Sequence, residues 1–379
     1  MIPFNKPFLC GEELSYVSEA IQSGSLSSDG PFTQECTKFF EIQFGMGKVF
    51  FTPSCTAALE MCALLLEIKP GDEVIVPSFT FVSSANAFCL FGAKVVFADS
   101  SSFHPNIDAE NIEKLITSKT KAIVVVHYGG VACDMEKIMQ TALKYGIYVV
   151  EDAAHAVGAY YESGSKKMAL GSIGHLGAIS FHVSKNITCG EGGLLIINDK
   201  SLEARAEIIR EKGTNRSSFL RGEVAAYEWI EKGSSYIASE ISLAFLLPQL
   251  KRLSRVQEHR IHLWNIYYET LLTLEEKGFL RLPEIPDFAR HNAHIFYLLC
   301  SSPEQRKELQ QYLLAQGIHT ATHYLPLHSS PYGKKNFPAY CPNAEYYGTN
   351  LLRLPVYYQL KEDEVEFICR SILSFFKIL

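Results

Sequence analysis

The feature that most constrains the fold is an alternation of short apolar runs and helix-like stretches between about residues 47 and 200. The apolar runs are unbroken and rich in β-branched residues, as expected of strands that are covered on both faces. Helix-like stretches such as 56–66 and 135–145 lie between them. The alternation predicts an α/β fold with a largely parallel sheet and crossover helices. The strand candidates are 48–52, 73–77, 94–98, 121–126 and 147–151.

The pattern changes beyond about residue 250. Residues 250–277 are predicted to form one long helix, and the remainder mixes short strands, helices and several prolines. A chain of 379 residues also exceeds the size at which a single core usually keeps growing. We therefore expect a large domain over residues 1–250 and a small C-terminal α/β domain over residues 251–379.

Charge and apolar content exclude several classes of protein. The net charge of −6 argues against broad binding to nucleic acid or to an anionic membrane. The N-terminus has no apolar segment followed by a cleavage site, and no apolar run reaches the ~18 residues of a membrane span. We therefore expect a cytoplasmic protein. Ten cysteines are scattered without zinc spacing, so we expect reduced, mostly buried thiols and no metal site.

Polar and aromatic residues follow the predicted strands at their carboxyl ends, where parallel sheets bind their ligands. Thr56 follows the first strand, Phe81 the second and Asp152 the strand at 147–151. Ser180 and Lys185 follow the apolar residues 178–179, in the stretch "SFHVSKNITCGEGG". Because all of these residues would lie at the same edge of the sheet, we expect them to form one ligand site.

Pyridoxal 5′-phosphate needs a lysine for a Schiff base and an acid beside its pyridinium nitrogen. Lys185, among small and apolar neighbours, supplies the amine, and Asp152 is a plausible acid partner. For Asp152, capping of a following helix is an equally good explanation. Gly190, Gly192 and Gly193 follow the lysine, so they predict an exit turn rather than a dinucleotide loop.

A helix that starts at Cys55 and Thr56 would offer backbone amides to a phosphate. Ordinary capping by Ser54 or Thr56 is the alternative and is favoured when the motif is taken alone. Ser180 could donate a further hydroxyl to the phosphate. Phe81 could stack on a pyridine ring, although an isolated aromatic side chain more often belongs to the core.

The order of "TPSCTAALE", "PGDEVIVPSFTF", "VVEDAAHAVGA" and "SFHVSKNITCGEGG" resembles the DegT/DnrJ-type sugar-nucleotide aminotransferases. The resemblance covers nearly the whole chain, to "LLRLPVYYQL" at 351–360. It implies pyridoxal-phosphate fold type I, as in aspartate aminotransferase, and a homodimer with shared active sites. It also implies roles for individual residues. Lys185 is the Schiff-base lysine, and the cofactor contacts are Cys55, Thr56, Phe81, Asp152, His155 and Ser180.

The resemblance places two further groups of residues. Many relatives complete the phosphate site with an asparagine from the partner subunit, and Ser235 stands at that position here. The segment "HYLPLH" implies substrate contacts for His323, Tyr324 and His328, with packing between domains as an equal alternative. Arg216, like Arg210 and Arg221, would suit a diphosphate, but structural salt bridges are at least as good an explanation.

Residues 210–236 look most like one subgroup, the dTDP-4-amino-4,6-dideoxygalactose transaminases of enterobacterial common antigen synthesis. The similarity implies that dTDP-4-dehydro-6-deoxy-glucose and glutamate give the 4-amino-4,6-dideoxy-galactose nucleotide and 2-oxoglutarate. The same chemistry could instead give the gluco epimer or a 3-amino sugar. Lys185 argues against the dehydratase branch, which has histidine there. Lys185 and Asp152 together argue against a regulator that binds the cofactor without turnover.

Overall fold

The computed structural model describes residues 1–378 and is built around a seven-stranded sheet in the order β1-β9-β8-β5-β4-β2-β3. Only β9 runs against the other six strands, so the prediction of a largely parallel sheet is confirmed. The strands are β1 (Lys48–Thr52), β2 (Glu73–Pro77), β3 (Lys94–Ala98), β4 (Thr120–Val126), β5 (Tyr148–Asp152), β8 (Leu176–Ser180) and β9 (Gly193–Ile197).

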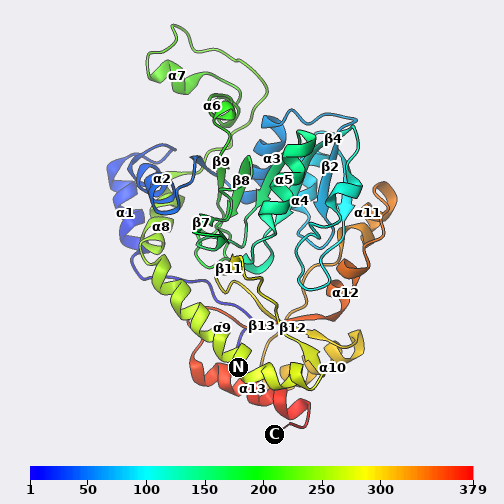
Figure 1. The fold of residues 1–379 in the computed structure, drawn as a ribbon. Helices are drawn as coiled ribbons and strands as arrows, with labels where there is room; N and C mark the ends of the chain where they lie inside the picture. The colour runs from blue at the N-terminus through cyan, green and yellow to red at the C-terminus, as the bar shows by residue number, and fades with distance from the viewer. Residues whose placement is uncertain (379) are drawn as a thin grey trace.

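Helices cover both faces of this sheet (Figure 1). On β2, Ile75 packs into one apolar cluster, whereas Val74 and Val76 pack into the other. This alternation explains why the strands are unbroken apolar runs. The first cluster contains α2 (Pro31–Phe44), α5 (Met135–Tyr145) and α8 (Glu240–Leu250), with α1 (Glu13–Ser23) beside α8. The second contains α3 (Cys55–Leu65), α4 (Ser83–Cys89) and α6 (Glu203–Arg210).

A smaller antiparallel sheet forms from the C-terminal third of the chain. Its strands are β10 (Leu280–Arg281), β12 (Phe296–Cys300) and β13 (Leu351–Leu354). It shares a core with the long helix α9 (Leu253–Glu276), with α10 (Pro303–Ala315) and with α13 (Glu362–Phe375). The predicted helix over 250–277 is therefore confirmed as α9.

The proposed division of the chain into two domains at residue 250 stays a prediction. Two backbone pairings join residues on either side of this boundary. Ile2 forms a parallel bridge with Ile318, so the first residues of the chain lie beside the C-terminal part. In addition, β11 (Ala289–Arg290) pairs with β6 (Tyr160–Ser163), which also pairs with β7 (Lys166–Ala169).

The glycine-rich turn after Lys185 is shorter than predicted. Gly193 is not part of an exit turn but the first residue of β9, which lies between β1 and β8. A side chain here has no room, because a Cβ atom on Gly193 would lie 2.3 Å from the carbonyl carbon of Ser54 and 2.4 Å from the nitrogen of Cys55. The glycine therefore permits β9 to begin directly against the start of α3.

Three further α-helices complete the described part of the chain. Figure 1 shows α6 and α7 (Arg216–Leu220), with the loops around them, projecting at one end of the molecule. α11 (Pro331–Asn336) and α12 (Pro342–Asn350) lead into β13. Among the described residues, no helix combines the length and the apolar character needed to cross a membrane.

Candidate active site

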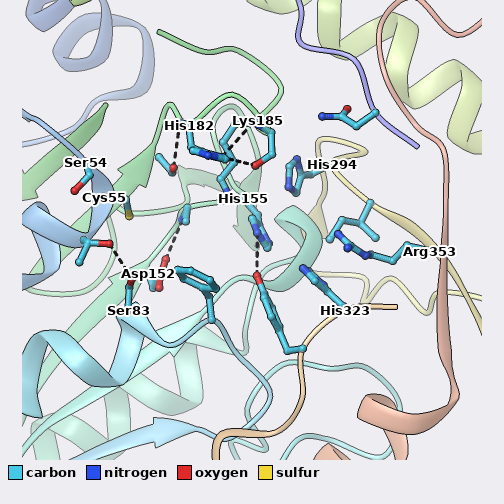
Figure 2. A pocket seen from close by; sticks show the side chains of 18 of the residues that line it. Ser54, Cys55, Ser83, Asp152, His155, His182, Lys185, His294, His323 and Arg353 are labelled. Carbon is cyan, nitrogen blue, oxygen red and sulfur yellow. Dashed lines mark hydrogen bonds between the residues drawn. The ribbon is translucent and has the colours of Figure 1, made fainter. Parts of the chain in front are cut away.

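A cavity of about 610 Å³ opens at the carboxyl edge of the large sheet. Loops of that sheet form one side of it, and residues of the N-terminal segment and of β13 form the other. Figure 2 shows Ser54, Cys55 and Asp152 on one side and His294, His323 and Arg353 on the other, with Lys185 and His155 between them. The large sheet and the small sheet therefore both contribute walls.

Lys185 lies in the loop that joins β8 to β9 and lines the cavity. Its backbone amide donates to the carbonyl of His182 at 2.9 Å, which fixes the turn that carries it. Burial lowers the pKa of the Lys185 amine, although the nearby charge of Asp152 acts in the opposite direction. A lowered pKa makes a larger fraction of the amine neutral and nucleophilic.

Asp152 is the last residue of β5 and is buried. Ser84 Oγ donates to its Oδ2 at 2.6 Å, and the amide of Ala154 donates to its Oδ1 at 3.1 Å. Burial raises the pKa of this carboxyl group, and both hydrogen bonds oppose that rise. Residues 153–159 form turns rather than a helix, so Asp152 is not a helix cap.

The start of α3 lines the same cavity. Ser54 Oγ accepts from the amide of Ala57 at 3.1 Å. Ser54 therefore caps the helix, as the capping alternative predicted. Within the described chain, the amides of Cys55 and Thr56 have no acceptor. Thr56 Oγ1 lies 2.7 Å from Ser83 Oγ, and Ser180 Oγ accepts from the amide of His182 at 3.3 Å, which leaves the Ser180 proton free. This arrangement of amides and hydroxyls suits a phosphate.

Aromatic side chains surround His155 in the middle of the cavity. Its Nδ1 accepts from the amide of Gly129 at 3.3 Å, and its Nε2 lies 3.4 Å from the hydroxyl of Tyr324. Burial lowers the pKa of His155 well below its usual value, so the ring is neutral. The rings of His155 and His294 are 4.4 Å apart. Phe81, with 55% of its surface exposed, also lines the cavity, and its ring centre lies 6.3 Å from that of Tyr324.

The segment 323–328, for which substrate contacts were expected, has residues both inside and outside the cavity. His323 and Tyr324 line it, and the hydroxyl of Tyr128 lies 2.7 Å from His323 Nδ1. His328 does not line it. Its two ring nitrogens lie 2.6 Å from Ser78 Oγ and 3.1 Å from Glu345 Oε1, so the packing alternative describes it and the expected substrate contact is corrected.

Two other predicted residues do not reach the cavity of their own chain. Arg216, on α7, lies 3.6 Å from Glu211 and is half-exposed. Ser235 is exposed and forms a backbone bridge with Glu211. Arg210 and Arg221 form ion pairs with Asp29 and Glu223 respectively, as the salt-bridge alternative proposed. The nine predicted residues that the structure brings together are Cys55, Thr56, Phe81, Asp152, His155, Ser180, Lys185, His323 and Tyr324.

Several residues that line the cavity or contact its lining were missed from the sequence. Ser84 could have been suspected, because it follows Phe81 by three residues at the start of a helix. Arg260, His294 and Arg353 carry no such local signal, since they come from α9, from the approach to β12 and from β13. Only the tertiary fold brings them to Lys185.

The polar groups on the large-sheet side of the cavity match the parts of pyridoxal 5′-phosphate. The free amides at the start of α3 match the phosphate, buried Asp152 matches the ring nitrogen, and Lys185 matches the aldehyde. The residues present therefore fit this cofactor.

Comparison with known proteins identifies the chain. The sequence profile of the DegT/DnrJ/EryC1/StrS aminotransferase family matches residues 9–373. The chain belongs to this family. It is a pyridoxal-phosphate-dependent sugar aminotransferase, which confirms the predicted fold class, cofactor and type of enzyme.

Three relatives illustrate the range of this aminotransferase family. The spore coat polysaccharide biosynthesis protein SpsC of Bacillus subtilis (strain 168) is 33% identical, over 99% of this chain and 97% of its own. The PMP form of the putative sugar aminotransferase Spr1654 from Streptococcus pneumoniae superimposes with a TM-score of 0.91 at 26% identity, over 100% of both chains. The aminotransferase TlmJ from Streptoalloteichus hindustanus gives a TM-score of 0.90 at 29% identity, over 100% of this chain and 99% of its own.

Proposed function

We propose that this aminotransferase converts dTDP-4-dehydro-6-deoxy-D-glucose and L-glutamate into dTDP-4-amino-4,6-dideoxy-D-galactose and 2-oxoglutarate. The observation that carries an amino transfer is the presence of Lys185 and buried Asp152 in one cavity. The choice of sugar nucleotide and of the galacto product depends on the sequence similarity of residues 210–236 to that subgroup.

When bound, pyridoxal phosphate accepts electrons from the substrate carbon and carries the amino group between the two substrates. Asp152 would hold the ring nitrogen protonated, His155 would lie beside the ring hydroxyl, and Phe81 would cover a ring face. The amides of Cys55 and Thr56, with the hydroxyls of Thr56 and Ser180, would hold the phosphate. The Lys185 amine would take a proton from the α-carbon of glutamate and later deliver one to C4 of the sugar.

His323 and Tyr324 would contact the sugar nucleotide, because they line the cavity opposite the start of α3. Ser235 would reach the cofactor phosphate in the active site of a partner subunit. Arg216, on the projecting helix α7, would lie near the substrate of that partner. Both are exposed in a single chain, which is consistent with contacts made across a homodimer. Ten free cysteines are consistent with a reaction in the cytoplasm.

The decisive experiment incubates the enzyme with dTDP-4-keto-6-deoxyglucose and L-glutamate, and assigns the amino sugar by NMR. An axial amine at C4 is expected. An equatorial amine at C4 would refute the galacto assignment, and an amine at C3 would refute the regiochemistry. Formation of no amino sugar from this nucleotide would refute the proposed acceptor.

A further inference from the structure

His294 reaches the cavity on a loop whose backbone conformation is unfavourable. The loop, residues 291–295, leads into β12, and Ala293 within it has a φ of +50°. A residue with a Cβ atom rarely adopts this left-handed conformation, which persists only where the surroundings enforce it. Strained positions of this kind cluster at ligand sites, which makes His294, the next residue, a candidate ligand contact.

Buried polar groups enforce the conformation of this loop. The guanidinium of Arg260, on α9, donates to the carbonyls of Ala293 at 3.0 Å and of His294 at 3.1 Å. Asn292, which is fully buried, accepts from the amide of His294 at 3.1 Å and donates to the carbonyl of His155 at 2.8 Å. A charged group and an amide are therefore buried, at a cost in free energy, where they hold the loop that carries His294.

Hydrogen bonds determine which ring nitrogen of His294 carries the proton. The amide nitrogen of Asn186, the neighbour of Lys185, donates to the carbonyl of Asn292 at 3.0 Å. The oxygen of the same amide group lies 2.8 Å from His294 Nδ1 and can only accept. The proton is therefore on Nδ1. Burial and the charges of Lys185 and Arg260 lower the pKa of His294 well below its usual value, so Nε2 stays an unprotonated acceptor at neutral pH.

This acceptor nitrogen lies close to the reacting centre. His294 lines the cavity, and Figure 2 shows its ring next to that of His155, with 4.4 Å between the ring centres. Its Nδ1 atom is hydrogen-bonded to Asn186, the residue after Lys185. Its Nε2 atom remains accessible and has no hydrogen-bond partner among residues 1–378. A ligand with a proton to donate would complete the site.

Proton inventory separates the ligands that an unprotonated nitrogen can bind. The carboxylates of glutamate carry no proton at neutral pH, so they have nothing to donate to Nε2, and its amino group is the group that is transferred. A sugar acceptor brings neutral hydroxyl groups, each of which can donate. In the proposed acceptor the carbonyl is at C4, and the only hydroxyl on an adjacent carbon is the 3-hydroxyl.

We propose that His294 Nε2 accepts a hydrogen bond from the sugar hydroxyl next to the carbonyl that is aminated, and so selects acceptors that carry this hydroxyl. The inference rests on the proposed function for the identity of that group, the 3-hydroxyl. His294 determines specificity, whereas the proton transfers belong to Lys185. An acceptor without the hydroxyl would leave Nε2 without a partner in a closed site, which lowers affinity.

The first test measures binding without turnover. dTDP-6-deoxyglucose has no ketone and cannot be aminated, and dTDP-3,6-dideoxyglucose differs from it only in lacking the 3-hydroxyl. Calorimetry with the holoenzyme should show about 10-fold tighter binding of the ligand that has the 3-hydroxyl, the usual effect of one hydrogen bond in a closed site. Equal dissociation constants for the two ligands would overturn the inference.

Two variants separate the acceptor nitrogen from the bond to Asn186. In His294→Asn the amide can replace Nδ1 and keep the contact with Asn186, but no acceptor remains at the place of Nε2. In His294→Gln the amide oxygen can reach the place of Nε2, while the contact with Asn186 is lost. The preference for the 3-hydroxyl should fall to within about twofold in His294→Asn and persist in His294→Gln. The reverse order would show that His294 only positions the loop with Lys185.

His291→Asn is the matched control, because His291 belongs to the same loop but does not line the active-site cavity. Its Nδ1 atom accepts from the amide of Ala293 at 3.1 Å, and an asparagine oxygen can accept from the amide two residues on in the same way. This variant should keep the wild-type preference within about twofold. The same loss of preference in His291→Asn and His294→Asn would assign the effect to the loop and overturn the role of Nε2.

The reaction of the holoenzyme with glutamate alone, followed by the absorbance of the cofactor, is a second readout. His294→Asn should keep its rate within about twofold, because the donor does not contact Nε2. A loss confined to this half-reaction would overturn the inference and assign His294 to the donor.

The binding comparison is separable from the proposed function. An equatorial amine at C4 would refute the galacto product and leave the role of His294 intact, since neither calorimetric ligand is aminated. Equal binding of the two ligands would overturn that role while the galacto assignment stands. An amine at C3 would overturn both, because the carbonyl would then replace the 3-hydroxyl.

Discussion

Ser84 donates a 2.6 Å hydrogen bond to the Asp152 carboxylate, and both side chains are buried. Thr80 Oγ1 lies 2.8 Å from the same serine oxygen, so a short chain of hydroxyls ends on the acid. The hydrogen bond from Ser84 to Asp152 opposes the effect of burial, which raises the pKa of Asp152. Ser84 is therefore a positioning residue that favours the ionised form of the carboxyl group.

The first prediction is a change in pH dependence on Ser84→Ala. Loss of the bond removes an interaction that lowers the Asp152 pKa, so the pKa should rise further. Because the carboxylate is the active form, activity is lost as the pH falls through this pKa. The acidic limb of kcat/KM should therefore move to higher pH. Ser371→Ala, at another buried serine on α13, should leave the profile unchanged.

The second prediction concerns Lys185→Ala. This variant should lose the visible absorbance of the bound cofactor and at least about 1,000-fold in turnover, because both the covalent anchor and the proton-transfer group are absent. Lys200→Ala, at an exposed lysine just beyond β9, should behave as wild type. Turnover by purified Lys185→Ala at a rate close to wild type would contradict the assigned role.

The third prediction is a packing defect on Gly193→Ala. The added methyl group would meet the backbone of Ser54 and Cys55 at 2.3–2.4 Å, so β9 and the start of α3 must separate. The free energy of unfolding should fall by ~1–3 kcal/mol, the usual cost of overpacking, and cofactor affinity should fall as well. Equilibrium unfolding and cofactor titration measure the two effects.

Gly164→Ala provides the comparison for this glycine. Gly164 has a φ of +58° and no atom within 4 Å of the place a methyl group would take, so only backbone strain of ~1–2 kcal/mol should appear. Its cofactor affinity should stay at the wild-type value. Equal losses of affinity at both glycines would show that the contact with α3 has no special effect.

The fourth prediction tests sites shared between subunits. Ser235→Trp should be inactive because it would block the partner's phosphate site, and Lys185→Ala is inactive in its own site. Co-expression of the two chains should restore about a quarter of wild-type activity, because half of the dimers are hybrids with one intact site each. Full activity of Ser235→Trp by itself would show that Ser235 serves no partner.

The sequence predicted most of the large sheet because its strands are buried on both faces and are therefore continuous apolar runs. It missed β9, where Gly193 follows Gly190 and Gly192 and has the composition of a turn. Nothing in the local sequence indicates that β9 runs antiparallel to its neighbours β1 and β8. Strand order depends on contacts between distant segments, such as Phe50 with Leu195.

The same limit divides the active site. Lys185, Asp152 and the start of α3 were predictable because each follows a recognisable strand at one sheet edge. Arg353 and His294 were not, since their position depends on how the small sheet packs against that edge. For His328 the motif left substrate contact and packing between domains as equal alternatives, and its contacts with Ser78 and Glu345 in the interior fit the packing alternative.

The place of β9 between β1 and β8 has a consequence for synthesis of the protein on the ribosome. The loop with Lys185 is held at one end by β8 and at the other by β9, which packs against β1 and the start of α3. A nascent chain that has not yet released Ile197 therefore lacks the strand that closes this loop. The emerging chain should be unable to retain its cofactor until translation has passed β9, although Lys185 and Asp152 have already been made.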